Sequence, residues 1–288
     1  MTIGISGAAG QLGRATTDLL LERVEPDTLV LVTRDPSLLQ AQADRGAAVR
    51  HGDYRDPGTL RDAYQDVDTL LLISGADIGQ RIAQHSAAVD AAKEAGVRRV
   101  AYTGIVNPTE ANAAAAAPEH RGTEEALLAS GLEWTFLRNG IYADLTADSL
   151  QQSIAAGQHV FNSGDGGTTY VTRADCAAAA AEVLAGDGHA NKAYDITGPE
   201  ALSGFDLAAL ASEISDKQVE PVSVDDDTLV SILVEHAGLP EFIAQFLASF
   251  GRAAREGQLG LVSDDFERLT GRPPARFRTL LEGAAAPA

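Results

Sequence analysis

Three glycines near the start of the chain are spaced as a phosphate-binding turn requires. The segment Gly7-Ala8-Ala9-Gly10-Gln11-Leu12-Gly13 follows the short apolar run Ile3–Ser6 and leads into a segment of helical character. Glycines in such a turn permit chain reversal, close approach of the backbone to a pyrophosphate and tight contact between helix and strand. The start of the helix then offers free N–H groups and a partial positive charge. The segment therefore predicts dinucleotide binding, and the alternative is a tight turn without a ligand.

The end of the next apolar run carries the residues that select between two forms of the dinucleotide. Leu29–Thr33 is followed by Arg34 and Asp35. An acid at this place would hold the ribose hydroxyls of NAD, whereas an arginine suits the 2′-phosphate of NADP. Because Asp35 precedes Pro36, we expect it to cap a helix. We therefore expect NADPH to be preferred, with NADH possible, and the alternative for Arg34 is a solvated surface charge.

Other residues at the ends of expected strands fit the same ligand. They are Asp53-Tyr54, Ile73-Ser74-Gly75, Thr103-Gly104 and Arg138-Asn139-Gly140. An open α/β sheet binds its ligand beyond the carboxyl ends of its strands. We expect Asp53 to bond the adenine amino group, and the backbones of Ser74-Gly75 and Thr103-Gly104 to line the ribose and nicotinamide. Taken singly, each of these segments could instead simply form a turn after its strand.

A proton donor of the usual kind for carbonyl reduction is missing. No tyrosine has a lysine four positions later, since the residues found there are Gly58, Asp68, Val106, Thr146, Ala174 and Gly198. Some acceptors need no such donor. A quinone yields a phenolate-like anion with a pKa of about 10, by analogy with tyrosine, and a carbocationic dye takes hydride alone. For these acceptors, holding the nicotinamide and the acceptor together in a dry pocket can be sufficient.

The elements that would position these residues follow a βαβ rhythm. Unbroken apolar runs such as Leu29–Val32 and Leu70–Ile73 are typical of strands buried on both faces of a parallel sheet. Asp35-Pro36 and Asp56-Pro57 are typical of helix starts, and Gly46, Gly96 and Gly131 of helix ends. We predict an α/β fold with a Rossmann-like, doubly wound parallel sheet. The expected strands are 3–6, 29–33, 48–51, 69–74, 99–103 and 133–137.

After Gly140 the rhythm becomes less regular. Residues 141–157 are expected to be helical, residues 159–171 to form two short strands around the turn 164–167, and Ala174–Leu184 to form a helix before a strand at Ala193–Thr197. Ser203 and Asp206 match a capping box, and the chain from about 225 onward reads as mostly helical. We expect the run Ala113–Ala117 to lie in a flexible loop.

This pattern predicts two domains. Residues 1–198 would form the NAD(P)-binding domain, and residues 199–288 a smaller, mostly helical substrate domain. The segment from about 141 to 170 would contribute to the substrate side.

Composition excludes several classes of protein. The chain has 288 residues, of which 45% are hydrophobic, and a net charge of −19 that would repel nucleic acid. One cysteine leaves no disulfide framework, and we predict no metal site. The start of the chain does not have the pattern of a signal peptide, and no run of 18 apolar residues would span a membrane. We expect a cytoplasmic protein.

The sequence resembles a known family over almost its whole length. The segments GISGAAGQLG, VRHGDY, LLISG, VAYTG and FLRNGIYAD, together with VTRADCAAAAAEVL and NKAYDITG, are similar to the NmrA-like branch of atypical short-chain dehydrogenases. The GxxGxxG spacing of the first segment is that of short-chain reductases, whereas ordinary dehydrogenases have GxGxxG. Within the branch, the resemblance is to bacterial NAD(P)H:quinone oxidoreductases and triphenylmethane dye reductases.

The resemblance implies direct hydride transfer without flavin to a quinone-like or cationic conjugated acceptor. It also implies that Asn139 and Tyr142 stand near the nicotinamide and the acceptor. Some relatives carry a lysine where this chain has Glu125, so a lysine-dependent mechanism is not expected. The alternative function is a non-catalytic, redox-sensing regulator that binds NAD(P) and acts through a protein partner. Both a monomer and a homodimer remain open. The residues expected to contact the cofactor by the family pattern are Gly7, Gly10, Gln11, Leu12, Gly13, Arg34, Ser74 and Gly75.

A few other side chains have two explanations each. His120 is either a proton shuttle or, as we expect, a surface or capping histidine. Tyr170 and Phe161 either line the pocket or pack the connecting strands. The stripe formed by Phe242, Phe246 and Phe250 predicts a helix face packed in the core, with a pocket wall or a dimer contact as alternatives.

Two features after residue 172 are expected to be structural. Arg173-Ala174-Asp175 is expected to start a helix and to anchor it by an ion pair. Cys176 is expected to be buried and inert.

Overall fold

Seven strands form one parallel sheet, as the apolar runs predict. The structure is a computed structural model that describes residues 1–285. The strand order is β10-β6-β5-β4-β1-β2-β3, and every neighbouring pair is parallel. The order reverses between β1 and β4, where a doubly wound sheet opens a crevice for a ligand. The strands are β1 (Ile3–Ser6), β2 (Leu29–Thr33), β3 (Ala48–His51), β4 (Thr69–Ile73), β5 (Arg99–Ile105), β6 (Glu133–Asn139) and β10 (Lys192–Ile196).

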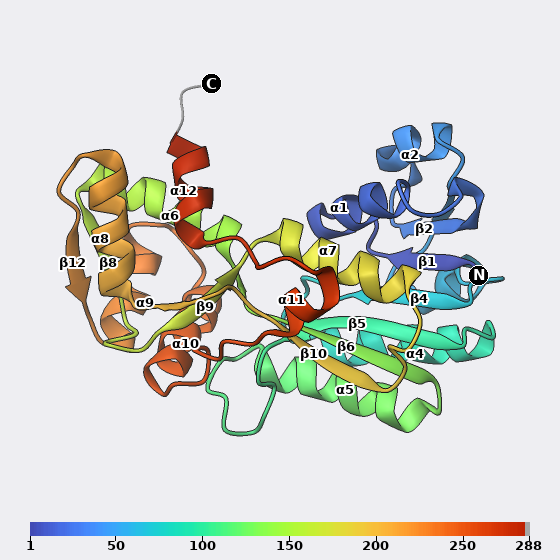
Figure 1. Ribbon diagram of the computed structural model, residues 1–288. Helices are drawn as coiled ribbons and strands as arrows, with labels where there is room; N and C mark the ends of the chain where they lie inside the picture. Colours follow the sequence, from blue (N-terminus) through green and yellow to red (C-terminus); the bar gives the residue numbers. More distant parts are fainter. Residues whose placement is uncertain (286–288) are drawn as a thin grey trace.

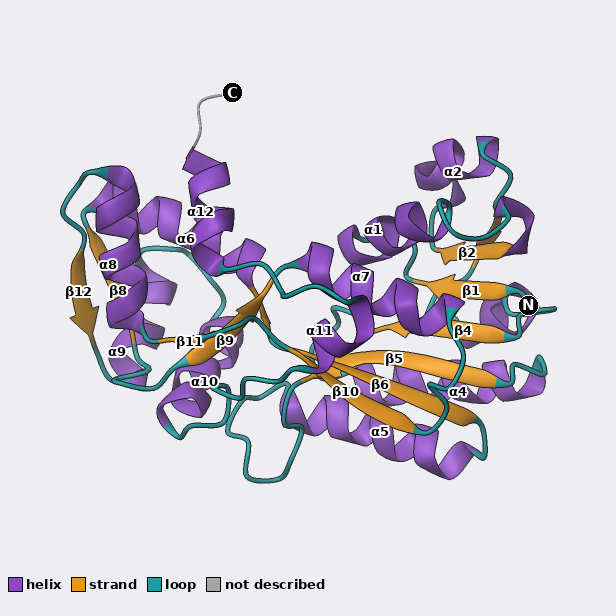
Figure 2. Cartoon of the chain, in the orientation of Figure 1, coloured by secondary structure: helices purple, strands orange, loops and turns teal. Residues whose placement is uncertain are grey.

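Helices cover both faces of this sheet (Figure 2). On one face, α1 (Gln11–Leu20) and α7 (Arg173–Ala185) share a buried apolar cluster with β1, β2 and β4, and α11 (Asp265–Thr270) packs on α7. On the other face, α3 (Leu60–Ala63), α4 (Arg81–Glu94) and α5 (Ala117–Ser130) share a second cluster. The short α2 (Gln40–Asp44) lies beside β3. The expected Rossmann-like architecture is confirmed.

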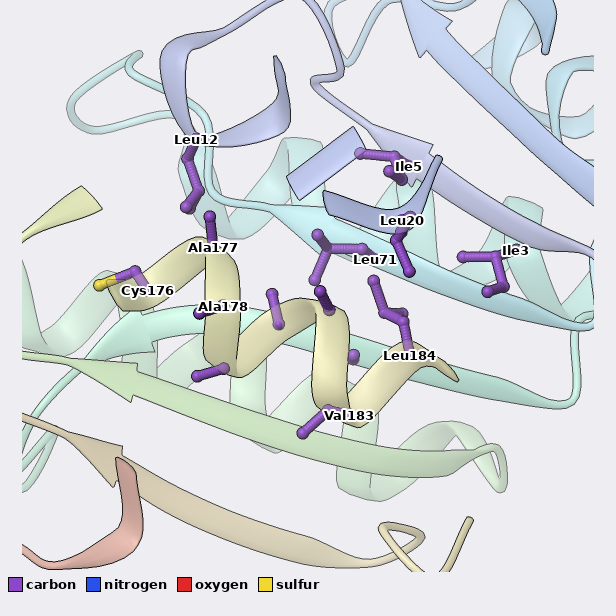
Figure 3. Packing of buried hydrophobic residues seen from close by; sticks show 14 of the residues in the cluster. Ile3, Ile5, Leu12, Leu20, Leu71, Cys176, Ala177, Ala178, Val183 and Leu184 are labelled. Carbon is purple, nitrogen blue, oxygen red and sulfur yellow. The ribbon is translucent and has the colours of Figure 1, made fainter. Parts of the chain in front are cut away.

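The alanine-rich helix α7 is the most deeply buried helix of the first face. Its run Ala177–Ala181 is almost completely enclosed. Small side chains let the helix lie close to α1 and to the sheet, where Ile5, Leu20 and Leu71 meet it (Figure 3). Cys176 is 2% exposed in this contact, as expected. The Asp175 carboxylate lies 2.7 Å from the Arg272 guanidinium, which confirms the anchoring ion pair.

The remaining elements form a second body beside the carboxyl ends of the large sheet (Figure 1). Strands β7, β9 and β11 make a small sheet, and β8 pairs in parallel with β12. Helices α6, α8 and α12 enclose a separate apolar cluster that includes Leu150, Leu207 and Phe277. These elements are β7 (Ile141–Tyr142), α6 (Ala143–Ala156), β8 (Gln158–Phe161), β9 (Thr168–Val171), β11 (Ala201–Leu202), α8 (Gly204–Ser215), β12 (Glu220–Ser223), α9 (Asp226–Glu235), α10 (Glu241–Arg255) and α12 (Phe277–Ala285).

Local capping follows the sequence with one exception. The Asp35 carboxylate accepts a hydrogen bond from the Ser37 amide, and Ser203 and Asp206 form a complete capping box. Gly131 ends α5 with φ +81°, in the left-handed region that glycine adopts without strain. Asp56 stands before its short helical turn but its carboxylate makes no capping hydrogen bond.

The expectation of a flexible loop at Ala113–Ala117 is wrong. Ala114, Ala116 and Ala117 are buried, and Ala117 already begins α5. The amide of Ala113 donates to Gln258 Oε1 at 2.8 Å, and that of Ala115 donates to Ser249 Oγ at 2.9 Å. Small side chains suit this segment because it is enclosed against α10 and the following turn.

Within residues 1–285 there is no helix with the length and apolar character needed to cross a bilayer.

Candidate functional site

The glycine turn between β1 and α1 is tightly folded on itself. Gly7 has φ +83°, and the amides of Gly7 and Ala8 both donate to Val32 O at 3.1 Å. A Cβ atom on Gly13 would lie 2.5 Å from Gly7 O, so no larger side chain fits there. The backbone segments at Gly7 and Gly13 therefore lie close together, and no side chain separates them. They form a glycine cradle that a pyrophosphate can approach, as the spacing predicts.

The start of α1 is free to bind an anion. Gly10 precedes the helix in an extended conformation, and no side chain caps the first amides. The amides of Gln11, Leu12 and Gly13 lie in the first turn, where a helix provides no acceptor of its own. They carry the partial positive charge of the helix start. The cradle and this helix start together fit a pyrophosphate.

Arg34 and Asp35 have separate roles in the structure. Asp35 Oδ1 accepts from the amide and the hydroxyl of Ser37, at 3.0 and 2.6 Å. The exposed Arg34 makes no hydrogen bond or ion pair with any residue from 1 to 285. The pKa of Asp77 is lowered mainly by hydrogen bonds from Arg55 and Gln84, and the charge of Arg34 adds a smaller effect. Its guanidinium is thus available for a phosphate beyond the end of β2.

Asp53 and Tyr54 follow β3, and each makes a hydrogen bond within the protein. Asp53 Oδ1 accepts a hydrogen bond from the Arg55 amide at 3.0 Å, which stabilises the turn after β3. The Tyr54 hydroxyl donates to Ile73 O at 3.0 Å and so ties the end of β3 to the end of β4.

The Ser74-Gly75 backbone is held by internal hydrogen bonds. The Ser74 amide donates to Thr103 Oγ1 at 3.1 Å, and the Gly75 amide donates to His85 Nε2 at 3.0 Å. Arg81 Nε donates to Gly75 O at 2.6 Å. These amides are therefore not free for a ligand, and this segment can line a cofactor only by its shape and its remaining oxygen atoms.

A cavity of 530 Å³ opens beyond the carboxyl ends of β4, β5 and β6. It lies where the large sheet meets the second body of the fold. Five of the residues expected at the strand ends or near the nicotinamide meet in it, namely Ser74, Gly104, Asn139, Gly140 and Tyr142. The other residues expected to bind the cofactor do not line it, namely those of the glycine turn and the start of α1 together with Arg34, Asp53, Tyr54, Ile73, Gly75 and Thr103.

Asn139 presents an unusual feature in this cavity. It is 3% exposed at the end of β6, and its Oδ1 is buried without a hydrogen-bond partner among the described residues. Its Nδ2 approaches the Tyr142 hydroxyl at 3.4 Å. An unpaired buried amide oxygen costs about 1–3 kcal/mol. A ligand with an amide N–H, such as a carboxamide, would satisfy it.

Tyr142 and His120 are the titratable rings of the cavity nearest the strand ends. Burial raises the pKa of Tyr142, although Asn139 and the Arg173 guanidinium, 5.2 Å from the ring centre, act against that rise. His120 is 8% exposed and pairs with the Tyr102 hydroxyl at 2.7 Å, so the expectation of a surface or capping residue is wrong. Burial, then the Arg81 charge, lowers the pKa of His120 to about 3.

The outer walls of the cavity are mainly apolar and aromatic. Phe246 and Phe250 line it from α10, whereas Phe242 on the same helix is 62% exposed. The expectation that this stripe packs in the core is wrong, and two of its three rings form a pocket wall. Phe161 and Tyr170 also line the cavity. Such walls suit a flat aromatic molecule.

Sequence reasoning missed many of the lining residues, and Arg81 and Leu145 are two examples. Arg81 lies at the start of α4, where its Nη1 bonds Glu119 Oε2 at 2.7 Å in a largely buried pair. Leu145 of α6 lines the cavity and remains 56% exposed. Neither belongs to a motif, and no signal in the sequence could have identified them.

A larger and more open groove of 1330 Å³ lies elsewhere, between the loop at Asn107 and the turn at Gly164–Gly167. Of the strand-end residues expected to fit the ligand it contains Arg138 alone, and it contains no residue of the glycine turn. Residues 1–285 contain no cluster of three or more side chains suited to bind a metal ion. The glycine cradle and the 530 Å³ cavity therefore form the best candidate site.

Comparison with known proteins supports this choice. Residues 7–187 match a family model described as NAD(P)H-binding. The chain is 37% identical to quinone oxidoreductase 2 of Escherichia coli over 94% of both chains. It is also 27% identical to an NmrA-like family oxidoreductase of Aspergillus flavus, over 94% of this chain and 90% of the other. The chain belongs to the NAD(P)H-binding, NmrA-like family.

Solved structures of family members have the same fold. The Escherichia coli NADPH-dependent quinone oxidoreductase, complexed with NADPH, matches with a TM-score of 0.95 and 36% identity over 98% of this chain and 99% of the other. Triphenylmethane reductase of Citrobacter, complexed with NADP(H), matches with a TM-score of 0.90 and 34% identity over 99% and 100%. Family membership therefore agrees with the resemblance seen in the sequence.

Proposed function

We propose that this protein is an NADPH-dependent reductase that passes hydride directly, without flavin, to a quinone-like or cationic conjugated acceptor. The observation that carries the proposal is an aromatic-walled cavity directly beyond the ends of β4, β5 and β6, in the same sheet as the glycine cradle after β1. Two relatives with solved structures are named as a quinone oxidoreductase and a triphenylmethane reductase.

The described residues fit a pyridine dinucleotide along this edge of the sheet. The cradle and the start of α1 would hold the pyrophosphate, Arg34 the 2′-phosphate and Asp53 the adenine. Asn139 Oδ1, which lacks a partner, would accept a hydrogen bond from the nicotinamide carboxamide. The proposed cofactor contacts are Gly7, Gly10, Gln11, Leu12, Gly13, Arg34, Asp53, Tyr54, Ile73, Ser74, Gly75, Thr103 and Gly104.

When bound, the reduced nicotinamide supplies a hydride. The chain's own residues bind and orient the two reactants and exclude water from between them. Tyr142 and Asn139 would position the nicotinamide and the acceptor, while Phe246 and Phe250 would stack against an aromatic acceptor. Tyr142 and His120 are both poor proton donors there, because burial raises the pKa of Tyr142 and lowers that of His120.

We further propose that residues 1–198 act as the cofactor domain and residues 199–288 as the substrate domain, with the segment from about 141 to 170 on the substrate side and α11 packed back on α7 of the cofactor domain. Helix α6, strands β8 and β9 and helix α10 all contribute to the wall opposite the strand ends.

A redox-sensing regulator is the competing function. The names of the relatives favour the reductase, since those compared are oxidoreductases or reductases. The test is the loss of NADPH absorbance with benzoquinone, menadione or a triphenylmethane dye and no added flavin. We expect turnover with at least one acceptor. Tight NADPH binding without turnover on any of them would support the regulator.

A further inference from the structure

We propose that His120 donates a hydrogen bond from Nε2 to the oxygen that becomes negative when a quinone-type acceptor receives hydride. The inference rests on the proposed function and adds to it a catalytic residue for one class of acceptor. His120 lies in the first turns of α5 and lines the 530 Å³ cavity together with Gly104 and Asn139. It is therefore placed beside the same strand ends that would hold the nicotinamide.

The hydrogen-bond network fixes the proton on His85, the neighbour of His120. The Gly75 amide donates to His85 Nε2 at 3.0 Å, so this nitrogen carries no proton. The proton of neutral His85 is on Nδ1, which lies 2.9 Å from Thr123 Oγ1 and donates to it. Thr123 Oγ1 in turn donates to Glu119 O at 3.0 Å.

The same reasoning then assigns the proton of His120. The Tyr102 hydroxyl lies 2.7 Å from His120 Nδ1. Thr123 also interacts with this hydroxyl, but Thr123 Oγ1 already pairs with His85 Nδ1 and donates its own hydrogen to Glu119 O. A buried hydroxyl must donate its hydrogen, so Tyr102 donates to Nδ1. Neutral His120 therefore carries its proton on Nε2. That atom has no partner in the described chain and is left to meet a molecule in the cavity.

The environment makes His120 a hydrogen-bond donor and not an acid. Burial, Arg81 and His85 all lower its pKa, to about 3, so the imidazolium form is absent near neutral pH. Burial also raises the pKa of Tyr102, although Thr123 acts against it, so the phenol keeps its proton. The charged groups around the pair are Arg81, Glu119 and Glu124, and Glu119 and Glu124 are paired with Arg81 and Arg138.

The reaction balances without a proton from the protein. The C4–H bond of NADPH breaks, and its electron pair and hydrogen form a new bond to the quinone. NADPH is oxidised to NADP⁺, and the quinone is reduced by two electrons to a hydroquinone anion. The anion later takes one proton from water. A fixed N–H donor aimed at the oxygen stabilises this charge as it develops.

A cationic triphenylmethane dye has no such oxygen. Hydride adds to its central carbon, and the positive charge disappears to give a neutral product. His120 should therefore matter for quinones and not for the dye. This difference separates the inference from the proposed function, because the dye reports on the proposed function alone.

The experiment compares His120→Leu and His120→Gln with the wild-type protein. Leucine removes the donor, while the glutamine amide can place an N–H near the position of Nε2. We expect His120→Leu to lower kcat/KM for menadione by about 10- to 100-fold, in line with loss of one oxyanion donor. The ratio of menadione to triphenylmethane dye activity should fall by a similar factor, and His120→Gln should recover most of this ratio.

His189→Leu is the matched control. His189 Nδ1 also pairs with a tyrosine hydroxyl, that of Tyr194 at 2.9 Å, but it does not line the cavity. This variant should leave the ratio of menadione to dye activity unchanged. The thermal unfolding of every variant is measured together with its dye turnover. The two measurements show whether a variant has lost folded protein.

A second measurement does not depend on activity. Two-bond ¹H–¹⁵N correlation spectra of the cofactor-free protein distinguish the two tautomers of each of the six histidines. The signals that disappear in His120→Gln identify His120, and we expect them to show a neutral ring protonated on Nε2. In Tyr102→Phe, this preference should weaken, because Nδ1 loses its donor.

Three results would overturn the inference. The first is an Nδ1-protonated His120, the second is an equal loss of menadione and dye activity in His120→Leu, and the third is no loss of either. If the wild-type protein reduces neither acceptor, the proposed function is wrong and the inference falls with it.

Discussion

Arg34 and Asp35 carry opposite charges at adjacent positions, and the structure gives each a different task. Asp35 is bonded to Ser37, whereas Arg34 is exposed and makes no bond within residues 1–285. A free guanidinium at the end of β2 favours the dinucleotide that bears the extra phosphate. A charge-assisted hydrogen bond of this kind contributes about 1.5–3 kcal/mol.

Arg34→Glu should therefore abolish the preference for NADPH. We expect kcat/KM for NADPH to fall by about ten- to a hundredfold, because the carboxylate repels the 2′-phosphate. The value for NADH should be nearly unchanged. Steady-state kinetics with both nucleotides measures the ratio, and Arg45→Glu, at another exposed arginine, is the control. A preference that survives Arg34→Glu would show that Arg34 does not select the cofactor.

At the scale of single elements, the glycine turn and helix α10 position the two halves of the site. The turn depends on the absence of side chains, since a Cβ on Gly13 would meet backbone atoms at 2.5–2.8 Å. Helix α10 instead depends on which residues it presents, since Phe246 and Phe250 face the cavity and Phe242 faces solvent.

Gly13→Ala should weaken cofactor binding. The added methyl group has to displace the backbone of Gly7 or Ala8, and a small displacement of a binding site costs up to about a hundredfold. We expect the Kd for NADPH, measured by fluorescence titration, to rise at least about tenfold. Gly283→Ala in α12 is the control, because nothing lies within 4 Å of its added carbon. An unchanged Kd in Gly13→Ala would contradict the proposed cradle.

Phe246→Ala should affect the acceptor and not the cofactor. Loss of a half-buried ring from the wall removes about 1 kcal/mol of contact, which corresponds to about a fivefold rise in KM for menadione. The Kd for NADPH should stay the same. Phe242→Ala, on the same helix but outside the cavity, provides the comparison. Equal effects of the two variants on KM would argue against α10 as the acceptor wall.

The sequence predicted the elements of the sheet well because strands buried on both faces need unbroken apolar runs, as in Leu29–Val32. The glycine turn was predictable for a similar reason, since few other residues adopt its backbone. The burial of His120 was not, because it depends on the packing of α5 against β5, where the Tyr102 hydroxyl pairs with the imidazole. The spacing of Phe242, Phe246 and Phe250 defined one face of a helix, but the spacing does not show whether that face contacts the core, a cavity or solvent.

For the whole molecule, two buried histidines link stability to pH. Burial and the Arg81 charge lower the pKa of His85 to about 4, and the pKa of His120 is lowered to about 3. In the unfolded chain both would have a pKa of about 6.5. Below that value the unfolded state binds protons that the folded state does not bind. The stabilising contribution is therefore complete above about pH 6.5 and is lost as the pH falls towards 3–4.

The free energy of unfolding should therefore drop between pH 7 and pH 5. Each of these histidines contributes about 2 kcal/mol to that drop. Urea denaturation at the two pH values measures it, and His120→Gln should show a drop that is smaller by about that amount. The same drop in variant and wild type would mean that His120 titrates normally in the folded protein.

The central claim is that hydride passes directly from a bound NADPH to an acceptor in the cavity. The most direct test uses NADPH deuterated at C4, with each of the two stereoisomers in turn, and a triphenylmethane dye in the absence of flavin. Mass spectrometry of the reduced dye should show one added deuterium with one stereoisomer and none with the other. Dye reduced without deuterium from either stereoisomer, or no reduction at all, would contradict the account.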